Sequence, residues 1–453
     1  MSSRTRSSPS TLPLPRSTPS CPFTIRRINP SAYLIRENDN FGEHPHIYAK
    51  ICSSDTFSII VLSDTGVGTN IPNPHYSSSS SQSSQPKFWN IGTFLEHTIN
   101  PGSRMPNVVI TTHCHYDHIL GIEHLPQADP PLPSSVSASH RHGVDTTSKP
   151  PLAHEPTRKQ PTIVLASSNS IDFLSPYSRL QRHSLCDRLN LRAPWYRITW
   201  AKDLSYVTYE DPLGGLPLQT NIQILHTPGH TPDSLSWFDA ETRLLCVGDS
   251  LYETESQETR DTPWGEEPRA AVILVKESVL CDWWASLAKV LDFVEERNAE
   301  VEDVADVADQ EEKMAGAAQD GIGSPPTHGL TFESLVHSDI GEEWRSIDVV
   351  PLPPKLRPRV LICAGHVTVN VDAAECLLAM QGFMARILRD EVPRKRLPDA
   401  RGEETWFWDD LLDSSREEKG SAQAGRFSLV SPLRVIEKGR RKIPREDWAL
   451  CGC

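Results

Sequence analysis

Hydrophobic residues in the first part of the chain occur in short segments, separated by polar residues, Gly or Pro. This spacing is typical of antiparallel strands joined by turns. The segments expected to form these strands are 23–25, 32–35, 47–51 and 57–62. Later apolar runs predict further buried strands at 107–111, 162–166, 222–225, 235–238, 243–247 and 359–363, and alternation predicts one at 195–200.

Helical periodicity is clearest in residues 277–297. The apolar positions that recur there at helical spacing are Val279, Leu280, Trp283, Trp284, Leu287, Val290, Leu291 and Val294. We expect this stripe to face the hydrophobic core. Weaker patterns predict helices at 88–99, 170–185 and 372–391.

Polar and Pro-rich stretches divide the chain. Residues 1–22 are basic and rich in Ser and Pro, and we expect a disordered tail. The tail has no apolar centre for a secretory signal, and its prolines oppose the helix of a mitochondrial transit peptide. The main domain is predicted at 23–393, with inserts near 69–87, 126–160 and 298–346. Residues 394–453 are predicted to be a C-terminal extension, whose aromatic residues at 406–408 pack on the domain rather than cover a site.

Composition and charge limit the function. The 453 residues carry a net charge of −14, which argues against a nucleic-acid partner, because such proteins cluster Lys and Arg. No apolar run is long enough to cross a membrane. Ten scattered Cys residues suit reduced thiols, so we expect a cytoplasmic location, with a mitochondrial one as the alternative.

The stretch Thr111–His118 contains a concentrated set of metal-ligand side chains: His113, His115, Asp117 and His118. Imidazole and carboxylate groups are ligands that zinc prefers. His113 and His115 are expected to point the same way, because side chains alternate in an extended segment, and Cys114 then packs inward. Asp117 and His118 follow where the chain turns toward a helix, so they can face a second metal ion. The histidines at 140, 142 and 154 lie in the insert at 126–160 and are expected to be solvated.

Other polar residues follow predicted strands. His230 ends the run Thr-Pro-Gly-His, Asp249 follows Gly248, and His366 follows Gly365. A carboxylate at the end of a buried strand is costly unless it is hydrogen-bonded or bound to a cation. Asp64 ends an earlier strand before Thr-Gly, and we expect it to accept backbone N–H bonds rather than bind metal.

These motifs, in this order, resemble the metallo-β-lactamase superfamily, in particular its glyoxalase II-like and thioesterase-like hydrolases. The resemblance implies an α/β fold, the four-layer αββα sandwich, with the metal site at one edge. It also implies that His113, His115 and His230 hold one zinc ion, and that Asp117, His118 and His366 hold a second. Asp249 bridges the two ions, and Asp117 and Asp249 act in catalysis.

The resemblance further implies a hydrolase whose two zinc ions hold a hydroxide that cleaves an ester or thioester. The expected substrate is a small acyl compound, such as an acyl-CoA, acyl-carrier or glutathione thioester. Alternatives are a β-lactam or lactone hydrolase, a persulfide dioxygenase with one iron ion, and a binding protein that has kept its metals. The acyl group, the leaving group and the oligomeric state are left open by the sequence.

Overall fold

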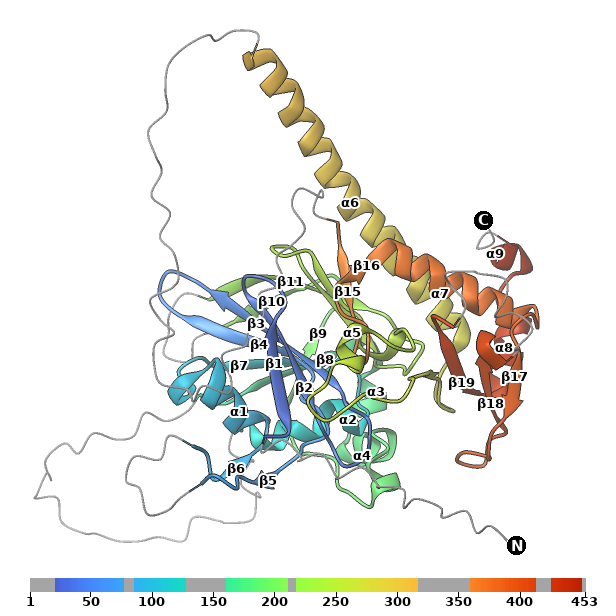
Figure 1. Ribbon diagram of the computed structural model, residues 1–453, viewed down its shortest axis with the longest axis horizontal. Helices are drawn as coiled ribbons and strands as arrows, with labels where there is room; N and C mark the ends of the chain where they lie inside the picture. Colours follow the sequence, from blue (N-terminus) through green and yellow to red (C-terminus); the bar gives the residue numbers. More distant parts are fainter. Residues whose placement is uncertain are drawn as a thin grey trace, which may run out of the picture.

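Two large β-sheets lie at the centre of the protein (Figure 1). The computed structural model describes residues 21–76, 85–127, 160–210, 217–316, 359–412 and 425–449. Within these residues the first sheet has seven strands in the order β1-β2-β3-β4-β7-β8-β9. Its strands are β1 (Phe23–Arg27), β2 (Ala32–Glu37), β3 (His46–Ser53), β4 (Ser58–Ser63), β7 (Asn107–Ile110), β8 (Ile163–Ser167) and β9 (Ile198–Ala201). The pairs up to β4 are antiparallel, and those from β4 to β9 are parallel.

The second sheet has six strands within the same residues, in the order β10-β11-β12-β13-β15-β16. Its strands are β10 (Tyr206–Tyr209), β11 (Leu218–His226), β12 (Leu235–Asp239), β13 (Leu244–Cys246), β15 (Leu361–Cys363) and β16 (Val371–Asp372). The pair β13 and β15 is parallel, and the other pairs are antiparallel.

The two sheets pack face to face, because alternate residues of their strands are apolar on both sides. Ile59 and Val61 of β4 join a buried cluster that also contains residues of β11, β12 and β13. Ile60 and Leu62, the intervening residues, join a second cluster, formed with the helices outside the first sheet. The predicted four-layer αββα sandwich is therefore confirmed.

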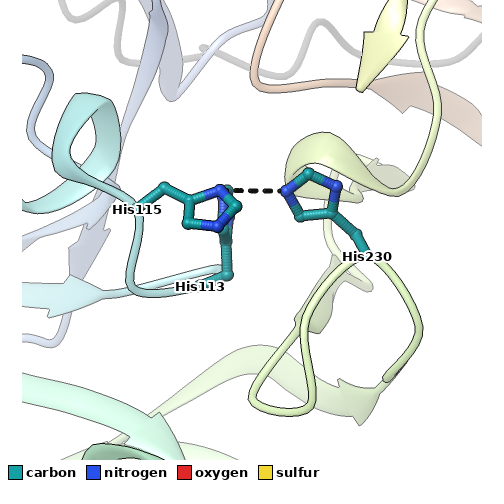
Figure 2. Close-up of side chains that lie close together, drawn as sticks. All are labelled: His113, His115 and His230. Carbon is teal, nitrogen blue, oxygen red and sulfur yellow. Dashed lines mark hydrogen bonds between the residues drawn. The ribbon is translucent and has the colours of Figure 1, made fainter. Parts of the chain in front are cut away.

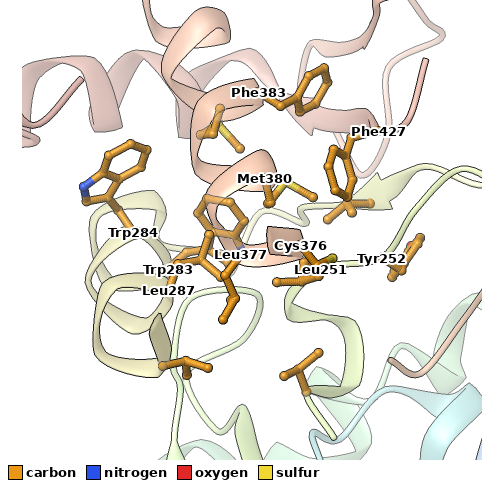
Figure 3. Packing of buried hydrophobic residues seen from close by; sticks show 14 of the residues in the cluster. Leu251, Tyr252, Trp283, Trp284, Leu287, Cys376, Leu377, Met380, Phe383 and Phe427 are labelled. Atoms are coloured by element: carbon orange, nitrogen blue, oxygen red, sulfur yellow. The ribbon is translucent and has the colours of Figure 1, made fainter. Parts of the chain in front are cut away.

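Helices cover the outer faces of both sheets. Those that follow the strands of the first sheet are α1 (Ile91–Thr98), η1 (Pro101–Ser103), α2 (Tyr116–Ile119), η2 (Leu120–His124), η3 (Ser168–Ser170), α3 (Ile171–Leu174), α4 (Tyr177–His183) and η4 (Cys186–Leu189). Those that follow β13 are η5 (Gly248–Ser250), α5 (Gln257–Arg260), α6 (Leu280–Gly316) and α7 (Ala373–Leu388). Figure 3 shows how Trp283 and Leu287 of α6 pack against Leu377 and Met380 of α7.

Several predicted boundaries were wrong, each for a local reason. Phe88–Trp89 is not helical but forms strand β6. This strand pairs with β5 (Ile71–Pro72), which lies within the insert predicted near 69–87. The helix begins only at Ile91, because the Asn90 side chain accepts from the backbone N–H of Thr93 and caps it. The helix predicted at 170–185 is divided into α3 and α4 at Pro176, which cannot supply a helical N–H.

The helix predicted at 277–297 is also longer than expected. Residues 298–316, assigned to an insert, continue α6 to Gly316, because they contain no Pro and are rich in good helix formers. The remainder of that insert, the tail at 1–20 and the histidines at 140, 142 and 154 lie outside the described residues. No helix in the described part of the chain has the length and apolar character needed to cross a membrane.

The C-terminal residues form a smaller sheet with the order β14-β19-β18-β17. Its strands are β14 (Val272–Ile273), β17 (Arg394–Arg396), β18 (Thr405–Asp409) and β19 (Ser428–Pro432), followed by α8 (Leu433–Lys442) and α9 (Arg445–Ala449), while η8 (Asp410–Leu412) follows β18. Trp408 is 1% exposed and lies in the same buried cluster as α6 and α7. The aromatic strand β18 therefore packs on the core, while a domain boundary at residue 393 stays a prediction.

Candidate metal centre

The residues proposed from the sequence as metal ligands converge at one edge of the sandwich, where strands of both sheets end. His113 and His115 lie between β7 and α2, and His230 lies between β11 and β12. The short turn η5 after β13 carries Asp249, and the loop after β15 carries His366. The seven proposed ligands form two groups, and within each group the ligand atoms are within 4.8 Å of one another. The first group is His113, His115 and His230, and the second group is Asp117, His118, Asp249 and His366.

The first group consists of three imidazoles that face one another (Figure 2). His115 Nδ1 lies 2.9 Å from His113 Nε2 and 3.1 Å from His230 Nε2. Burial lowers the pKa of all three rings, that of His115 to about 3. The rings are therefore neutral near pH 7 and keep lone pairs that can bind a cation.

The second group combines two carboxylates with two imidazoles. Asp117 Oδ2 lies 3.3 Å from Nε2 of both His118 and His366. Asp249 Oδ1 lies 3.3 Å from His118 Nε2, and its Oδ2 lies 3.5 Å from His366 Nε2. Asp249 is thus placed between the two histidines.

The outer nitrogen of each of these histidines is held by a neighbour. His118 Nδ1 donates to Asp64 Oδ2 at 2.9 Å, and His366 Nδ1 donates to the backbone carbonyl of Glu43 at 3.0 Å. Because Nδ1 is held by these acceptors, Nε2 is the nitrogen that faces the centre of the group and that would lose its proton to bind a metal ion. This arrangement is common around metal-binding histidines, whose second nitrogen is oriented by a carboxylate or carbonyl.

Asp64 therefore has a larger role than the sequence suggested. It accepts the expected backbone hydrogen bond, from Thr112 N at 2.7 Å, and it also orients His118. The position of this carboxylate at a strand end could be predicted from the sequence, but its histidine partner could not. The role of the Glu43 carbonyl was missed altogether, because a backbone atom leaves no sequence signal.

Charge in the second group is balanced between acids and bases. Burial would lower the pKa of His118, but the surrounding carboxylates outweigh burial and raise that pKa well above its ordinary value. Burial also opposes protonation of His366, yet Asp249 and Asp117 raise its pKa to about 10. Conversely, the histidines lower the pKa of Asp249 well below its ordinary value despite its burial. The protons on the two histidines thus balance the two carboxylates, and a bound cation would take the place of these protons.

The distances within both groups fit zinc. Four ligand atoms about 2.0–2.1 Å from one tetrahedral ion lie roughly 3.3–3.4 Å apart. The separations of 3.3–3.5 Å in the second group agree with this value, and those of 2.9–3.1 Å in the first are slightly shorter. Among the described residues, the buried atoms His118 Nε2 and Asp249 Oδ1 have no hydrogen-bond partner, so a cation between them is a natural partner.

Two glycines allow the close packing of this centre. A Cβ atom on Gly365 would lie 2.4 Å from Asp249 Oδ1 and 2.8 Å from the His118 ring. A Cβ atom on Gly229, which has φ of +143°, would lie 2.2 Å from Cα of Trp283 in α6. The residues before His366 and His230 must therefore be small, which explains why glycine precedes each ligand.

The family of this chain follows from a comparison of its sequence with known protein families. The sequence model described as the metallo-beta-lactamase superfamily matches residues 82–306, a stretch that includes every proposed ligand except His366. The chain belongs to the metallo-beta-lactamase superfamily. This superfamily consists mostly of hydrolytic metalloenzymes, so membership supports an enzymatic function.

The chain is also similar to a curated protein of Aspergillus versicolor, "Putative transcription factor avaE", with 24% identity over 243 residues. The similar region is 51% of this chain and 56% of the relative, so the chain spans about half the length of the curated relative it matches.

Solved structures that resemble this fold include a metallo-beta-lactamase from Pontibacter korlensis. It has 14% identity and a TM-score of 0.30, and the match covers 60% of this chain and 85% of that chain. A metallo-beta-lactamase family protein from Thermus thermophilus has 11% identity and a TM-score of 0.36, covering 82% of this chain and 85% of that chain.

A pocket of about 210 Å³ lies beside both groups of this superfamily member. His115 and His230 of the first group and Asp117, Asp249 and His366 of the second line it. The other walls come from residues 42–44, 185–188 and 267–275, together with the ring of Tyr252. The pocket is therefore open to side chains of both groups at once.

Proposed function

We propose that this chain is a zinc-dependent hydrolase that cleaves an ester or thioester of a small acyl compound. The observation that carries the proposal is the orientation of the two groups, whose ligand atoms face inward beside one pocket. His113, His115 and His230 would hold one zinc ion. Asp117, His118 and His366 would hold a second, with Asp249 shared between the two.

Two bound zinc ions would supply Lewis-acid polarisation of the carbonyl and make water a stronger nucleophile near neutral pH. The protein's own contribution is orientation. Asp64 and the Glu43 carbonyl fix the rings of His118 and His366, so little reorganisation is needed when substrate binds. Asp117 lines the pocket, so its carboxylate could accept a hydrogen bond from the attacking water and orient it.

Two side chains beside the proposed ligands, Cys114 and Ser234, are poorly suited to act as the nucleophile. Burial raises the pKa of the Cys114 thiol well above its ordinary value, so the reactive thiolate is not formed near pH 7. The hydroxyl of Ser234 is hydrogen-bonded to Thr231 Oγ1 at 2.8 Å, and neither residue lines the pocket. These observations support attack by water, which is expected of a hydrolase with two metal ions.

Metal analysis tests the proposal against its main competitor. In the protein as purified, without added metal, we expect about two zinc ions per chain by mass spectrometry. Turnover should then appear in a panel of acyl thioesters and esters. One iron ion per chain, with persulfide consumed together with oxygen, would support the dioxygenase instead. Hydrolysis of β-lactams or lactones but not of thioesters would retain the mechanism and change the substrate.

The name of the Aspergillus versicolor relative raises transcription as another function for this chain. The net charge of this chain, −14, argues against binding to the phosphate backbone of DNA. The pocket beside seven inward-facing ligand side chains supports catalysis on a small molecule instead. A gel-shift assay with random-sequence DNA at low salt should show no complex; a stable complex would favour the regulatory function.

A further inference from the structure

The pocket beside the metal centre has charged side chains on its walls besides the proposed ligands. They are Glu43, Arg188, Glu267 and Arg269. A charge at a binding pocket is informative when no other protein group neutralises it, because it is then available to a ligand. The partners of these four side chains therefore indicate what the pocket is built to bind.

Both acidic side chains on the pocket wall, Glu43 and Glu267, interact with other protein groups. Glu43 accepts a hydrogen bond from the hydroxyl of Tyr116. Glu267 forms an ion pair with the buried Arg36 and accepts from Trp264 Nε1 at 2.8 Å. Arg36 therefore neutralises Glu267, whereas Glu43 is partly buried and one of its carboxylate oxygens is occupied by Tyr116.

The two arginines differ. Arg269 donates to the carbonyl of Gly425 at 2.7 Å and lies 3.7 Å from Asp409. Arg188 is exposed, and within the described parts of the chain it has neither an ion pair nor a side-chain hydrogen bond. Among the charged side chains on the pocket wall, Arg188 is thus the cation that no described carboxylate neutralises by an ion pair, and its planar guanidinium is available to a ligand.

The turn that carries Arg188 is attached to the ligand loop. Tyr116 N, next to the proposed ligand Asp117, donates to the carbonyl of Ser184 at 2.8 Å. The short helix η4 is bracketed by two left-handed residues, Leu185 with φ of +62° and Asn190 with φ of +55°. Leucine rarely adopts this conformation, and its cost indicates that tertiary contacts hold the turn in place. Arg188 is therefore presented at a defined position beside the centre.

We propose that Arg188 determines specificity in this pocket by binding a carboxylate on the substrate. The inference rests on the proposed hydrolase function, because it assigns the substrate of the same site. The planar guanidinium matches a carboxylate through two parallel hydrogen bonds. A carboxylate is favoured over a phosphate dianion because one free guanidinium balances a single negative charge. The substrate class is then an ester or thioester that bears a carboxylate close to its scissile carbonyl.

A pair of zinc-binding thiols tests this without requiring turnover. 3-Mercaptopropionate carries a carboxylate, and 3-mercapto-1-propanol has a neutral hydroxyl in its place. Binding of both to the zinc-loaded protein is measured by calorimetry for the wild type, Arg188→Gln and Arg188→Lys. The control is Arg182→Gln, which removes the same charge from an exposed arginine of α4 that does not line the pocket.

We expect Arg188→Gln to lower the affinity for 3-mercaptopropionate about tenfold or more, which is the size expected for a lost charge-assisted hydrogen bond. The affinity for 3-mercapto-1-propanol should change by less than about twofold. Arg188→Lys should restore part of the loss, and Arg182→Gln should change neither ligand. The proposal would be overturned if Arg188→Gln lowered the affinity for both thiols equally or for neither. It would also be overturned if Arg182→Gln lost as much affinity for 3-mercaptopropionate as Arg188→Gln.

Kinetics separates this proposal from the hydrolase assignment. With S-succinyl- and S-acetyl-N-acetylcysteamine as the anionic and neutral thioesters, Arg188→Gln should raise KM for the succinyl compound about tenfold and leave kcat nearly unchanged. The acetyl compound should be unaffected. If neither thioester is hydrolysed but the thiols show the expected selectivity, the thioesterase assignment fails and the role of Arg188 in binding a carboxylate stands.

Discussion

Asp64 Oδ2 accepts a hydrogen bond from His118 Nδ1 at 2.9 Å, and the same carboxylate accepts from the backbone N–H of Thr112. One buried acid at the end of β4 therefore ties the ligand loop to the sheet and orients a proposed ligand from it. The contact links residues 54 positions apart in the chain. The contact therefore holds the His118 ring at a fixed orientation within the second group.

Removing this contact should weaken metal binding. We expect Asp64→Ala to lower the affinity of the second site for zinc by about 10- to 100-fold, because His118 loses the partner that orients it. Competition with a chromogenic chelator measures the change. Asp172→Ala, at a side chain that is 99% exposed, is the control and should bind zinc as the wild type does. An unchanged affinity in Asp64→Ala would show that His118 is held by other contacts.

The two groups should lose metal independently. His113→Ala removes a ligand of the first group only, so we expect about one zinc ion per chain and no turnover. Asp249→Ala, at the residue placed between His118 and His366, should also abolish turnover and release metal. Zinc content by mass spectrometry, with circular dichroism to verify folding, measures both. Full activity in a metal-free variant would remove the metal-dependent mechanism.

A methyl group at Gly365 should damage the second group sterically. Because its Cβ would lie 2.4 Å from Asp249 Oδ1, Gly365→Ala should displace this carboxylate and reduce zinc to about one ion per chain. Gly402→Ala is a suitable comparison, since a methyl group there meets no atom within 4 Å. That variant should keep its zinc, although its positive φ costs some stability. Two zinc ions retained in Gly365→Ala would show that the loop adapts.

The buried Glu37 should make stability depend on pH. Burial raises the pKa of Glu37 to about 7, although its carboxylate accepts from the backbone N–H groups of Val67 and Thr69. A carboxyl group with a raised pKa in the folded state keeps its proton longer than in the unfolded state. Its stabilising contribution is therefore fully present below about pH 4.5 and is lost as the pH rises to about 7.

Urea unfolding at pH 5 and pH 8 measures this effect. Between these pH values the free energy of unfolding should fall by about 2.5 kcal/mol more in the wild type than in Glu37→Gln, following 1.36 kcal/mol per pKa unit. Glu37→Gln should itself be less stable at pH 5, because its amide cannot accept from both N–H groups. Asp172→Asn is the control and should follow the wild type. A parallel pH dependence in the wild type and Glu37→Gln would contradict the assignment.

Trp408 should contribute to stability and not to catalysis. It is 1% exposed within the cluster that includes Trp283 and Met380, so Trp408→Ala should reduce the free energy of unfolding by about 3–5 kcal/mol. Zinc content and kcat/KM of the folded variant should stay unchanged. Trp195 is 45% exposed, and Trp195→Ala should cost less than about 1 kcal/mol. Lost activity in a fully folded Trp408→Ala variant would place the C-terminal segment in the site.

The sequence predicted the elements whose signal is local. Alternating residues such as Ile59 and Ile60 identified the strands, because each side of a strand in this sandwich faces a different apolar layer. It failed where one residue overrides a periodic pattern. Asn90 delays α1 by capping it, and Pro176 divides the helix predicted at 170–185.

By itself, the sequence determined which side chains are candidates for the centre, because histidines and acids at strand ends stand out from their apolar surroundings. Only the tertiary structure decided how they meet. His230 and His366 come within reach of His113–His118 because strands of two different sheets end at the same edge. The Glu43 carbonyl and Arg188 could not be found from the sequence, since a backbone oxygen has no residue type and an exposed arginine resembles any other. Their significance depends on distances across the fold, which residue spacing along the chain does not encode.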